Sequence, residues 1–358
     1  MRISEIYIRK NRMQLKEPLK VAFGVIPYSE NVLVRVSTDE GITGYGEAAP
    51  LAFVTGETCE SVMSALKMFK RTLTGMDSLN LEGIHAAMDR ACSGNTSAKC
   101  AIDLAMYDIW GKASGLPVYR LLGGADGKVI NDITIGIGKP EEMAEKAKYH
   151  VENGYGIIKI KAGLNVEEDI RAIRMIREAV GEKVRLRVDA NQGYDVTAAL
   201  KALGGFARYH VESVEQCLPA WDMEGAAYLR KKAPAIDLML DESIHSPHDA
   251  ARACRMEAAD ILNIKLMKCG GLYPALKIQA VAESFGLKCM VGCMLESRLS
   301  ITAGLSLASA KNNIPDADCD SFAGCTSEIS IEGGFGFQGQ EFCLENKPGL
   351  GVEVEELF

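Results

Sequence analysis

The sequence predicts an α/β protein: a (β/α)8-type barrel, or modified TIM barrel, with an α+β capping domain formed by the N-terminal part and the C-terminal tail. From about residue 128 onward, short β-rich runs alternate with amphipathic helical stretches, and repeated strand–helix units form parallel sheets with right-handed crossovers. The polar residues that close five successive runs are spaced 24 to 28 residues apart: Lys161, Asp189, Glu215, Asp241 and Lys265. Reactive groups at the carboxyl end of every strand are typical of a barrel, whereas an open doubly wound sheet concentrates its chemistry at one switch point.

Residues 1–125 read as strands followed by helices, and we assign them to the capping domain. The polarity alternates along the early runs as it does in half-buried strands. The pattern becomes helical from Glu57, and a helix over 97–113 has Ser97 as its expected N-cap. The strands of this domain are expected at residues 1–10, 31–37 and 41–48.

Residues 126–326 are assigned to the barrel. Its predicted strands lie at 129–136, 156–163, 184–191, 210–216, 236–243, 259–266 and 287–294. Helical stretches are expected between them, among others at 141–153, 167–180, 222–232, 247–257 and 274–285. After about Ser327 the sequence becomes rich in glycine, and residues 327–358 are predicted to leave the barrel and to pack back on the capping domain.

Composition and charge exclude several classes of protein. The chain has 358 residues, of which 47% are hydrophobic and 25% charged, and this excludes wholesale disorder. The net charge of −8 without a basic block argues against nucleic acid or an anionic membrane as the main partner. No apolar run approaches the ~20 residues of a membrane span, and residues 1–10 lack the apolar core of a signal peptide. Eleven scattered cysteines without a CxxC pair indicate reduced thiols in a cytoplasmic protein.

Three carboxylates end successive predicted strands: Asp189, Glu215 and Asp241. Three oxygen ligands that converge on one barrel mouth suit a hard divalent cation. The alternative interpretation is helix N-capping, because aspartate is common where a strand leads into a helix. The matching spacing favours a metal site, and it favours Glu215 over Glu212 as the ligand of the fourth strand.

Lysines occupy the second and sixth predicted strands. Lys159 and Lys161 share one face of the second strand because side chains alternate with a period of two, and both are expected to point into the barrel. Their mutual repulsion and desolvation predict that a lysine pKa falls from its usual ~10.4 toward neutral pH. Lys265 closes the sixth strand, roughly across the barrel, and is preferred on spacing to the alternative Lys268.

A cation flanked by two lysines suits proton abstraction next to a carboxylate. The α-proton is very weakly acidic because its removal makes a dianionic enediolate, which a divalent cation stabilises. One lysine would remove the proton from one face and the other would return a proton to the opposite face. Such a site inverts the configuration of the carbon.

The sequence resembles the enolase superfamily, in its muconate-lactonising subgroup, and is most similar to the dipeptide epimerases. The resemblance covers nearly the whole chain. It rests on the segments SAKCAIDLAMYDIWGKASGLPVYRLLGG, KIK, DAN, EQ, DES, NIKLMKCGG and MVGCMLES.

The resemblance implies a mechanism and the roles of several residues. Lys161 and Lys265 would be the acid/base pair, the three carboxylates would bind one Mg²⁺ per subunit, and Lys159 would assist electrostatically and help to hold the substrate carboxylate. The implied reaction is a 1,1-proton transfer that inverts the α-carbon of the C-terminal residue of a dipeptide. The implied partner is this small-molecule dipeptide, and the chain could act as a homo-oligomer.

The resemblance also implies substrate contacts near the eighth and first strands. Asp318 and Asp320, in the segment DCD, correspond to a pair that binds the free α-ammonium group of a dipeptide. Two carboxylates side by side make a good cation site, although a solvated acidic loop is the simpler interpretation. Further contacts are expected at Thr134 and at the main chain of Cys293 and Met294.

Two departures from the family pattern concern specificity. The family's Glu-Gln-Pro reads EQCLP here, so that Pro219 is displaced by two positions and the loop after the fourth strand is altered. Epimerases for acidic dipeptides often carry a basic residue about where this chain has Gly24. The glycine therefore favours another side chain in the substrate, such as an apolar one.

Other functions are weaker alternatives. Within the superfamily they are racemisation of N-acylamino acids, the o-succinylbenzoate synthase reaction and muconate cycloisomerisation, and outside it a catalytically silent barrel. GFGFQG at 334–339 satisfies a dinucleotide-binding pattern but leaves no room for a βαβ unit. His245 and His248 do not form a zinc-site spacing, and Trp110 and Trp221 are interpreted as packing residues.

Overall fold

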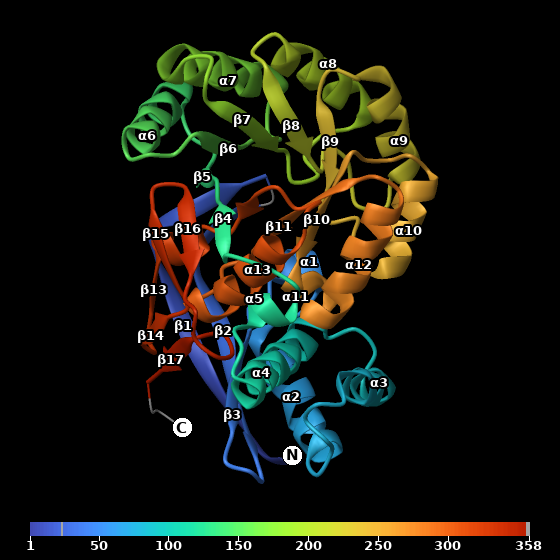
Figure 1. Cartoon of the computed structure of the whole chain (residues 1–358). Coiled ribbons are helices and arrows are strands. Elements are labelled where there is room, and N and C mark those ends of the chain that lie inside the picture. Colours follow the sequence, from blue (N-terminus) through green and yellow to red (C-terminus); the bar gives the residue numbers. More distant parts are fainter. Residues whose placement is uncertain (23, 356–358) are drawn as a thin grey trace.

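The computed structural model describes residues 1–22 and 24–355 and shows a parallel barrel joined to a β-rich cap (Figure 1). The barrel sheet has eight strands in sequence order from β5 to β12. It closes where Asn131 forms a parallel bridge with Ala317, and the Asp132 main-chain N–H donates to the Ala317 carbonyl at 2.9 Å. The predicted fold class is therefore confirmed. The strands are β5 (Ile133–Ile135), β6 (Ile157–Lys161), β7 (Arg185–Asp189), β8 (Val211–Glu215), β9 (Asp237–Leu240), β10 (Ile261–Lys265), β11 (Lys288–Gly292) and β12 (Ala317–Asp318).

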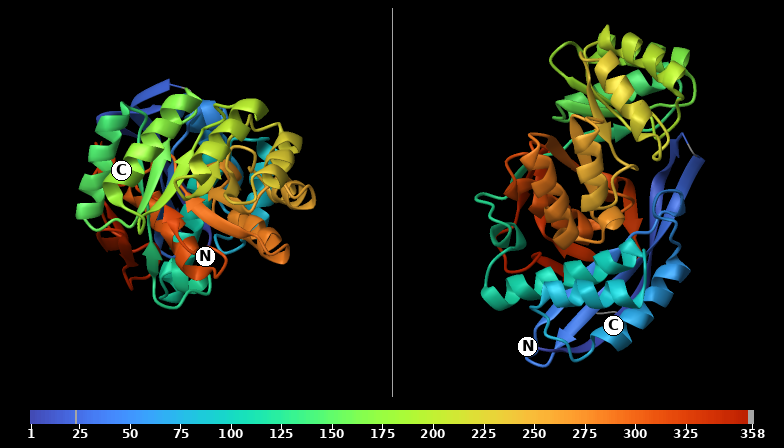
Figure 2. Two further views of the ribbon diagram at one scale, coloured as in Figure 1. Left: turned by 90° about the horizontal axis from the view of Figure 1, so that it is seen from above. Right: turned by 90° about the vertical axis from the view of Figure 1, so that its right-hand side faces the viewer.

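Amphipathic helices cover the outside of the barrel, as the view from above shows (Figure 2). The helices that follow the three carboxylate-bearing strands begin at other residues: Asp195, Asp222 and Ser246 accept hydrogen bonds from main-chain N–H groups of the first helical turn. The carboxylates that close the strands are thus not the helix caps, and the capping interpretation of those residues is wrong. The helices are α6 (Pro140–Glu152), α7 (Val166–Val180), α8 (Val196–Ala207), α9 (Met223–Lys232), α10 (Pro247–Arg255), α11 (Leu266–Cys269), α12 (Leu272–Ser284) and α13 (Arg298–Ala310).

The cap is an antiparallel sheet with helices packed on it. Its strands β1 (Ile3–Val21) and β2 (Gly24–Thr38) form a long hairpin, and β3 (Thr43–Ala48) pairs with β2. The hairpin is longer than the predicted strands, because β1 continues beyond residue 10, where the buried Met13, Leu15 and Val21 alternate with exposed polar residues. In the right-hand view of Figure 2 this blue hairpin reaches from the cap to the barrel, and the Ile137 N–H donates to the Lys20 carbonyl at 3.0 Å.

The cap helices pack closely on the sheet. A Cβ at Gly46 would lie 1.8 Å from the main-chain oxygen of Ala101, so α4 could not approach β3 if another residue stood there. The prediction that Ser97 is the N-cap of α4 is wrong, because Asn95 takes that position. Ser97 instead donates through N and Oγ to Glu57 Oε2 at 3.0 and 2.7 Å. A carboxylate from another segment thus satisfies the helix N-terminus. The cap helices are α1 (Ala52–Thr55), α2 (Cys59–Leu73), α3 (Leu81–Ala91), α4 (Thr96–Ser114) and α5 (Val118–Leu121).

The C-terminal tail returns to both parts of the molecule. Strand β13 (Cys325–Ser327) pairs with β1, and β16 (Glu341–Leu344) pairs with β4 (Lys128–Ile130). The predicted first barrel strand at 129–136 is therefore split, since β4 joins the tail and only β5 joins the barrel. The GFGFQG segment forms β15 (Phe335–Gln338) and its turn into β16, beside the pair β14 (Ile331–Gly333) and β17 (Val352–Val354). The domain boundaries near 125 and 326 remain a prediction. None of the helices in the described ranges is long and apolar enough to cross a membrane.

Candidate active site

A cavity of about 630 Å³ lies at the carboxyl ends of the barrel strands and is closed by the cap. The barrel contributes most of the polar side chains of its wall, whereas the cap contributes mainly apolar ones, together with Lys16 and Glu17. The barrel residues include Thr134, Lys161, Asn191, Glu242, Lys265, Asp318 and Asp320, and the cap residues include Leu15, Leu19, Val21, Ile26, Leu51 and Val54. This position matches the active-site end of barrel enzymes.

The three predicted metal ligands lie on neighbouring strands and are buried. Asp189 and Glu215 are the last residues of β7 and β8 and are paired in register, and Asp241 directly follows β9. Glu212, the rejected alternative, points away from the cavity, where it binds Arg185 at 2.9 Å. The strand geometry therefore brings the predicted trio to one edge of the barrel.

The two predicted acid/base lysines stand on opposite walls of the cavity. Lys161 closes β6 and Lys265 closes β10, four strands farther along the eight-stranded sheet. Lys161 Nζ lies 2.6 Å from Asp189 Oδ2, and Lys265 Nζ lies 2.7 Å from Asp241 Oδ2. Both amines thus flank the trio, one at each end.

Lys159 lies among the carboxylates and does not line the cavity. Its Nζ is 2.6 Å from Asp318 Oδ2 and 2.8 Å from Glu215 Oε2. Burial alone lowers the pKa of Lys159, but the charges of Asp318 and Glu215 outweigh it and raise the pKa well above its usual value. The predicted decrease is therefore wrong for Lys159. The same balance, with Asp241 as the strongest anion, raises the pKa of Lys265.

Lys268 is a second counter-ion of the trio. It is fully buried, and its Nζ donates to Asp241 Oδ1 at 2.5 Å and to the Asn263 carbonyl at 3.1 Å. Burial alone raises the pKa of Asp241, but Lys265 and Lys268 together hold it well below its usual range. Lys265 rather than Lys268 faces the cavity, in agreement with the preference drawn from the spacing.

The positive charges of the lysines do not fully neutralise the buried carboxyl groups of the cluster. Burial and the nearby charge of Asp189 raise the pKa of Glu215 to about 7, and burial and Asp241 raise the pKa of Glu242 to about 8. The buried oxygens Asn191 Oδ1 and Glu242 Oε2 have no hydrogen-bond partner, although both residues line the cavity. Within residues 1–22 and 24–355, no three acidic, histidine or cysteine side chains converge on a ready-made ion site, because the lysine amines lie among the carboxylates.

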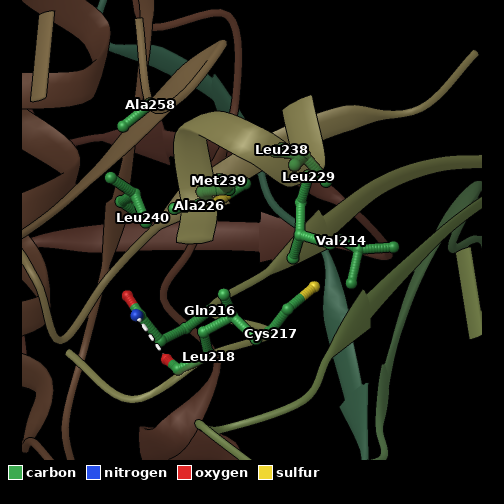
Figure 3. A pocket seen from close by; sticks show the side chains of 10 residues that line it. All are labelled: Val214, Gln216, Cys217, Leu218, Ala226, Leu229, Leu238, Met239, Leu240 and Ala258. Carbon is green, nitrogen blue, oxygen red and sulfur yellow. Dashed lines mark hydrogen bonds between the residues drawn. The ribbon is translucent and has the colours of Figure 1, made fainter. Parts of the chain in front are cut away.

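Asn191, Gln216 and Glu242 were not predicted as site residues, although they stand in the quoted DAN, EQ and DES segments. Gln216 Oε1 accepts from the Asp241 N–H at 2.9 Å, which links the end of β8 to that of β9. Its Nε2 donates to the Leu218 carbonyl at 2.8 Å, and this bond shapes the unusual EQCLP loop. Figure 3 shows the small apolar pocket beside Gln216, whose volume of about 10 Å³ holds at most one water.

Asp318 and Asp320 meet Thr134 at one end of the cavity. Asp320 Oδ2 accepts from the Thr134 N–H at 2.7 Å, and Asp318 Oδ1 accepts from Thr134 Oγ1 at 3.4 Å. Burial and the charge of Asp318 raise the pKa of Asp320 to about 6. Asp318 ends β12, whereas Asp320 lies beyond the strand, just before the 3-10 turn Ser321–Gly324.

The loop after β11 is held from the cap. Glu47 on β3 accepts hydrogen bonds from Asn31 Nδ2 at 2.8 Å and from Ser297 Oγ at 2.6 Å. The Met294 N–H donates to Glu296 Oε1 at 2.8 Å, so this expected substrate donor is already engaged within the loop. Cys293 and Met294 line the cavity, as predicted for substrate contacts, but the buried network around Glu47 was not visible in the sequence.

The buried Glu296 gives a pH prediction. Burial raises its pKa to about 7, above the ~4.3 of an exposed glutamic acid, so the folded state binds more protons and stability is expected to fall as pH rises from about 5 to 7. Glu296→Gln cannot titrate and should melt progressively higher relative to the wild type across this range. Melting curves at each pH test this, with the exposed Glu145→Gln as control. Parallel profiles of Glu296→Gln and wild type would contradict it.

Comparisons with known proteins place the chain in a family. Residues 3–123 match the N-terminal domain of mandelate racemase / muconate lactonizing enzyme, and residues 142–357 match the enolase C-terminal domain-like family. The chain therefore belongs to the enolase superfamily, in the family of mandelate racemase and muconate lactonizing enzyme, and the resemblance drawn from the motifs is confirmed.

Individual relatives align over nearly the full length. The chain is 40% identical to a hydrophobic dipeptide epimerase of Enterococcus faecalis, covering 98% of this chain and 99% of the relative. It is 42% identical to an L-Ala-D/L-Glu epimerase of Clostridium acetobutylicum, covering 99% of each. The crystal structure of the dipeptide epimerase from Enterococcus faecalis, complexed with Mg and L-Leu-L-Tyr, superposes with a TM-score of 0.96 at 40% identity and covers 99% of this chain and 100% of that one. These relatives are epimerases, a class of isomerases.

Proposed function

We propose that this chain is a Mg²⁺-dependent dipeptide epimerase. It inverts the α-carbon of the C-terminal residue of a dipeptide by 1,1-proton transfer through an enediolate. The observation that carries the proposal is the pair of amines, Lys161 and Lys265, on opposite walls of one cavity with buried carboxylates between them. The full-length similarity to dipeptide epimerases supports it.

The carboxylate trio fits a divalent cation. Its donors are all oxygens, which Mg²⁺ prefers, and the raised pKa of Glu215 indicates unneutralised negative charge. Asn191 Oδ1 and Glu242 Oε2, which have no hydrogen-bond partner, are further oxygens at the same edge of the barrel that could bind a cation or its water ligands. Asp189, Glu215 and Asp241 would hold one Mg²⁺ per subunit. When bound, the ion supplies electrostatic stabilisation of the negative charge that develops on the substrate carboxylate.

The lysines perform the proton transfers. For a substrate α-carbon held between them, one amine in its neutral form removes the proton from its face, and the opposite ammonium donates a proton to the other face. The roles exchange for the opposite stereoisomer. Lys159 stays charged, since the surrounding carboxylates raise its pKa, and it provides a fixed positive charge beside the substrate carboxylate.

Asp320 is proposed to bind the free ammonium group of the dipeptide, together with Asp318. Asp318 already binds Lys159, whereas the carboxylate of Asp320 meets only the Thr134 segment in the hydrogen bonds described above. A substrate without an ammonium group at this end, such as an N-acylamino acid, would leave the buried carboxyl group of Asp320 without a cationic partner. This argues against the N-acylamino acid racemase alternative, and the presence of every lysine and carboxylate of the cluster argues against a silent barrel.

Asp320→Asn is expected to raise KM for free dipeptides about tenfold or more, because a charged hydrogen bond contributes about 1.5–3 kcal/mol. KM for the N-acetylated form of the same dipeptide should not change. Steady-state kinetics with both substrates test this. An equal change in both KM values, or none in either, would rule out the ammonium role.

The apolar wall of the cavity favours apolar side chains in the substrate. The charged side chains at its rim are already engaged: Glu17 binds Lys146 at 2.7 Å, and Lys16 Nζ donates to the Ala323 carbonyl at 2.9 Å. Because Lys16 and Glu17, the charged cap residues of the described cavity wall, are engaged in these contacts, a charged substrate side chain would be buried without a partner.

We expect kcat/KM for dipeptides with an apolar C-terminal residue to exceed that for L-Ala-L-Glu by at least about 100-fold, given the cost of burying an unpaired charge. Ile26→Arg, which adds a cation to the wall, should narrow this ratio. Val25→Arg is the matched control because Val25 is 60% exposed and does not line the cavity. A wild-type preference for acidic or basic dipeptides would contradict the expectation.

We also propose a cytoplasmic location and, for the assembled enzyme, a homo-oligomer. All eleven cysteines lie in the described part of the chain and carry free thiols, as is usual in a reducing compartment.

A further inference from the structure

Two cysteines meet at the edge of the active-site cavity, and the proposed reaction uses neither thiol. Cys293 directly follows β11 and lines the cavity. Cys319 directly follows β12, between Asp318 and Asp320, and is only 1% exposed. From the sequence alone both are interpreted as ordinary core cysteines, because 25 residues separate them and nothing in the sequence indicates that they are neighbours.

The strand register places the two cysteines side by side. β11 and β12 are parallel neighbours, and their last paired residues are Gly292 and Asp318. Cys293 and Cys319 are the next residue on each strand. Neighbouring strands are about 4.8 Å apart, which lies within the range of Cα separations that a disulfide spans.

Both side chains also point to the same side of the sheet. Gly292 faces the barrel interior, since a Cβ there would lie 2.7 Å from Asn263 Oδ1, and Asp318 reaches Lys159 inside the barrel. Because side chains alternate along a strand, the next residues share the opposite side. A hydrogen bond with the Cys293 thiol, together with burial, raises the pKa of the Cys319 thiol well above its usual value.

We propose that Cys293 and Cys319 are a redox-sensitive pair whose reversible disulfide impairs substrate binding in the cavity. The crosslink itself follows from the register and the orientation of the two thiols. Its effect on catalysis rests on the proposed function.

The chemistry requires an oxidant, and a peroxide is sufficient. Cys293 is partly exposed whereas Cys319 is buried, so Cys293 reacts first: its sulfur attacks hydrogen peroxide, water leaves, and the thiol becomes a sulfenic acid. The Cys319 sulfur then attacks the Cys293 sulfur, the S–S bond forms, and a second water leaves. Two thiols and one peroxide give one disulfide and two waters, and a dithiol reductant reverses the step.

The position of Cys319 connects this bond to the substrate site. Its thiol now donates to the Val291 carbonyl at 3.6 Å, and its main-chain N–H donates to Asn131 Oδ1 at 2.8 Å. A bond to Cys293 takes the sulfur away from that carbonyl and pulls on the residue between Asp318 and Asp320. The pair that is proposed to bind the ammonium group is therefore displaced, and KM should rise more than kcat falls.

A third thiol offers a competing reaction. Cys325 also lines the cavity, but it lies on β13, where it pairs with Leu15 of the cap. The strand register does not place Cys325 beside Cys319. A crosslink that includes Cys325 would therefore contradict the proposed pair.

The experiment treats the reduced full chain with equimolar hydrogen peroxide and then alkylates the remaining thiols. The expected result is a mass loss of two hydrogens, a count of free thiols lower by two than the original eleven, and one crosslinked peptide joining Cys293 and Cys319. KM for an apolar dipeptide should rise at least fivefold and return to its starting value with dithiothreitol. Cys343→Ser, an exposed thiol on β16, should behave as the wild type.

Cys319→Ala should give no crosslink and no reversible rise in KM relative to its own untreated state, and Cys293→Ala serves the same purpose if the first variant folds poorly. A first crosslink between Cys293 and Cys325, or any other pair, would overturn the proposal. So would a Cys293–Cys319 crosslink that leaves KM unchanged. If the untreated protein turns over no dipeptide, the proposed function fails, while the peptide map still decides whether the pair exists.

Discussion

Alanine in place of either Lys161 or Lys265 is expected to lower the rate of epimerisation by about 10²–10⁴-fold, the usual contribution of a general acid or base. Each variant should nevertheless still exchange the α-proton of one of the two stereoisomers with solvent. The remaining amine can still remove the α-proton from the stereoisomer that presents it and return a deuteron to the same face. Lys161→Ala and Lys265→Ala should therefore exchange opposite stereoisomers without inverting either.

The basis of this expectation is the placement of the two residues on strands four apart in an eight-stranded barrel. Proton NMR in D₂O with each purified diastereomer measures exchange and inversion separately. Lys148→Ala, an exposed lysine on α6, is the matched control and should retain both. If one lysine variant exchanged both stereoisomers, or if both variants exchanged the same one, the opposed arrangement would be wrong.

Asp241→Asn is expected to abolish Mg²⁺ binding and to destabilise the fold. Asp241 is buried between two amines, 2.7 Å from Lys265 Nζ and 2.5 Å from Lys268 Nζ. Removing one partner of a buried ion pair leaves an unpaired charge in the interior, at a cost of about 3–5 kcal/mol in the free energy of unfolding. Calorimetric titration with Mg²⁺ and urea unfolding in the presence of a chelator measure the two effects independently.

A double variant separates metal binding from folding. Asp241→Asn with Lys268→Met removes one of the two buried charges that Asp241 compensates, so stability should recover in part while Mg²⁺ binding stays absent. Glu212→Gln is the control: it lies on the same strand as Glu215 but pairs with Arg185 away from the cavity, and it should bind Mg²⁺ normally. Unaltered Mg²⁺ affinity in Asp241→Asn would refute the assignment of the trio.

Much of the site could be predicted because a barrel repeats one local unit. Each apolar strand ends in a polar residue, and parallel strands bring their carboxyl ends to one mouth. This geometry let the spacing select Asp189, Glu215 and Asp241, and it favoured Lys265 over Lys268. Sequence spacing alone thus defined which strand ends meet.

The missed features depend on contacts between distant segments. Gln216 supports Asp241 across neighbouring strands, and Glu47 reaches the loop after β11 from another domain. The predicted decrease of a lysine pKa considered the neighbouring lysine and desolvation, whereas three carboxylates from other strands surround Lys159 and reverse the shift. The outer half of β1 was also missed, although the buried Met13, Leu15 and Val21 alternate along it with exposed residues.

The central claim is tested most directly by the wild-type enzyme, Mg²⁺ and an apolar dipeptide such as L-Leu-L-Tyr in D₂O. We predict that the α-proton of the C-terminal residue is replaced by deuterium as the opposite diastereomer appears, and that removal of Mg²⁺ stops both processes. Exchange at the N-terminal residue instead, or no exchange at either position with Mg²⁺ present, would contradict the account.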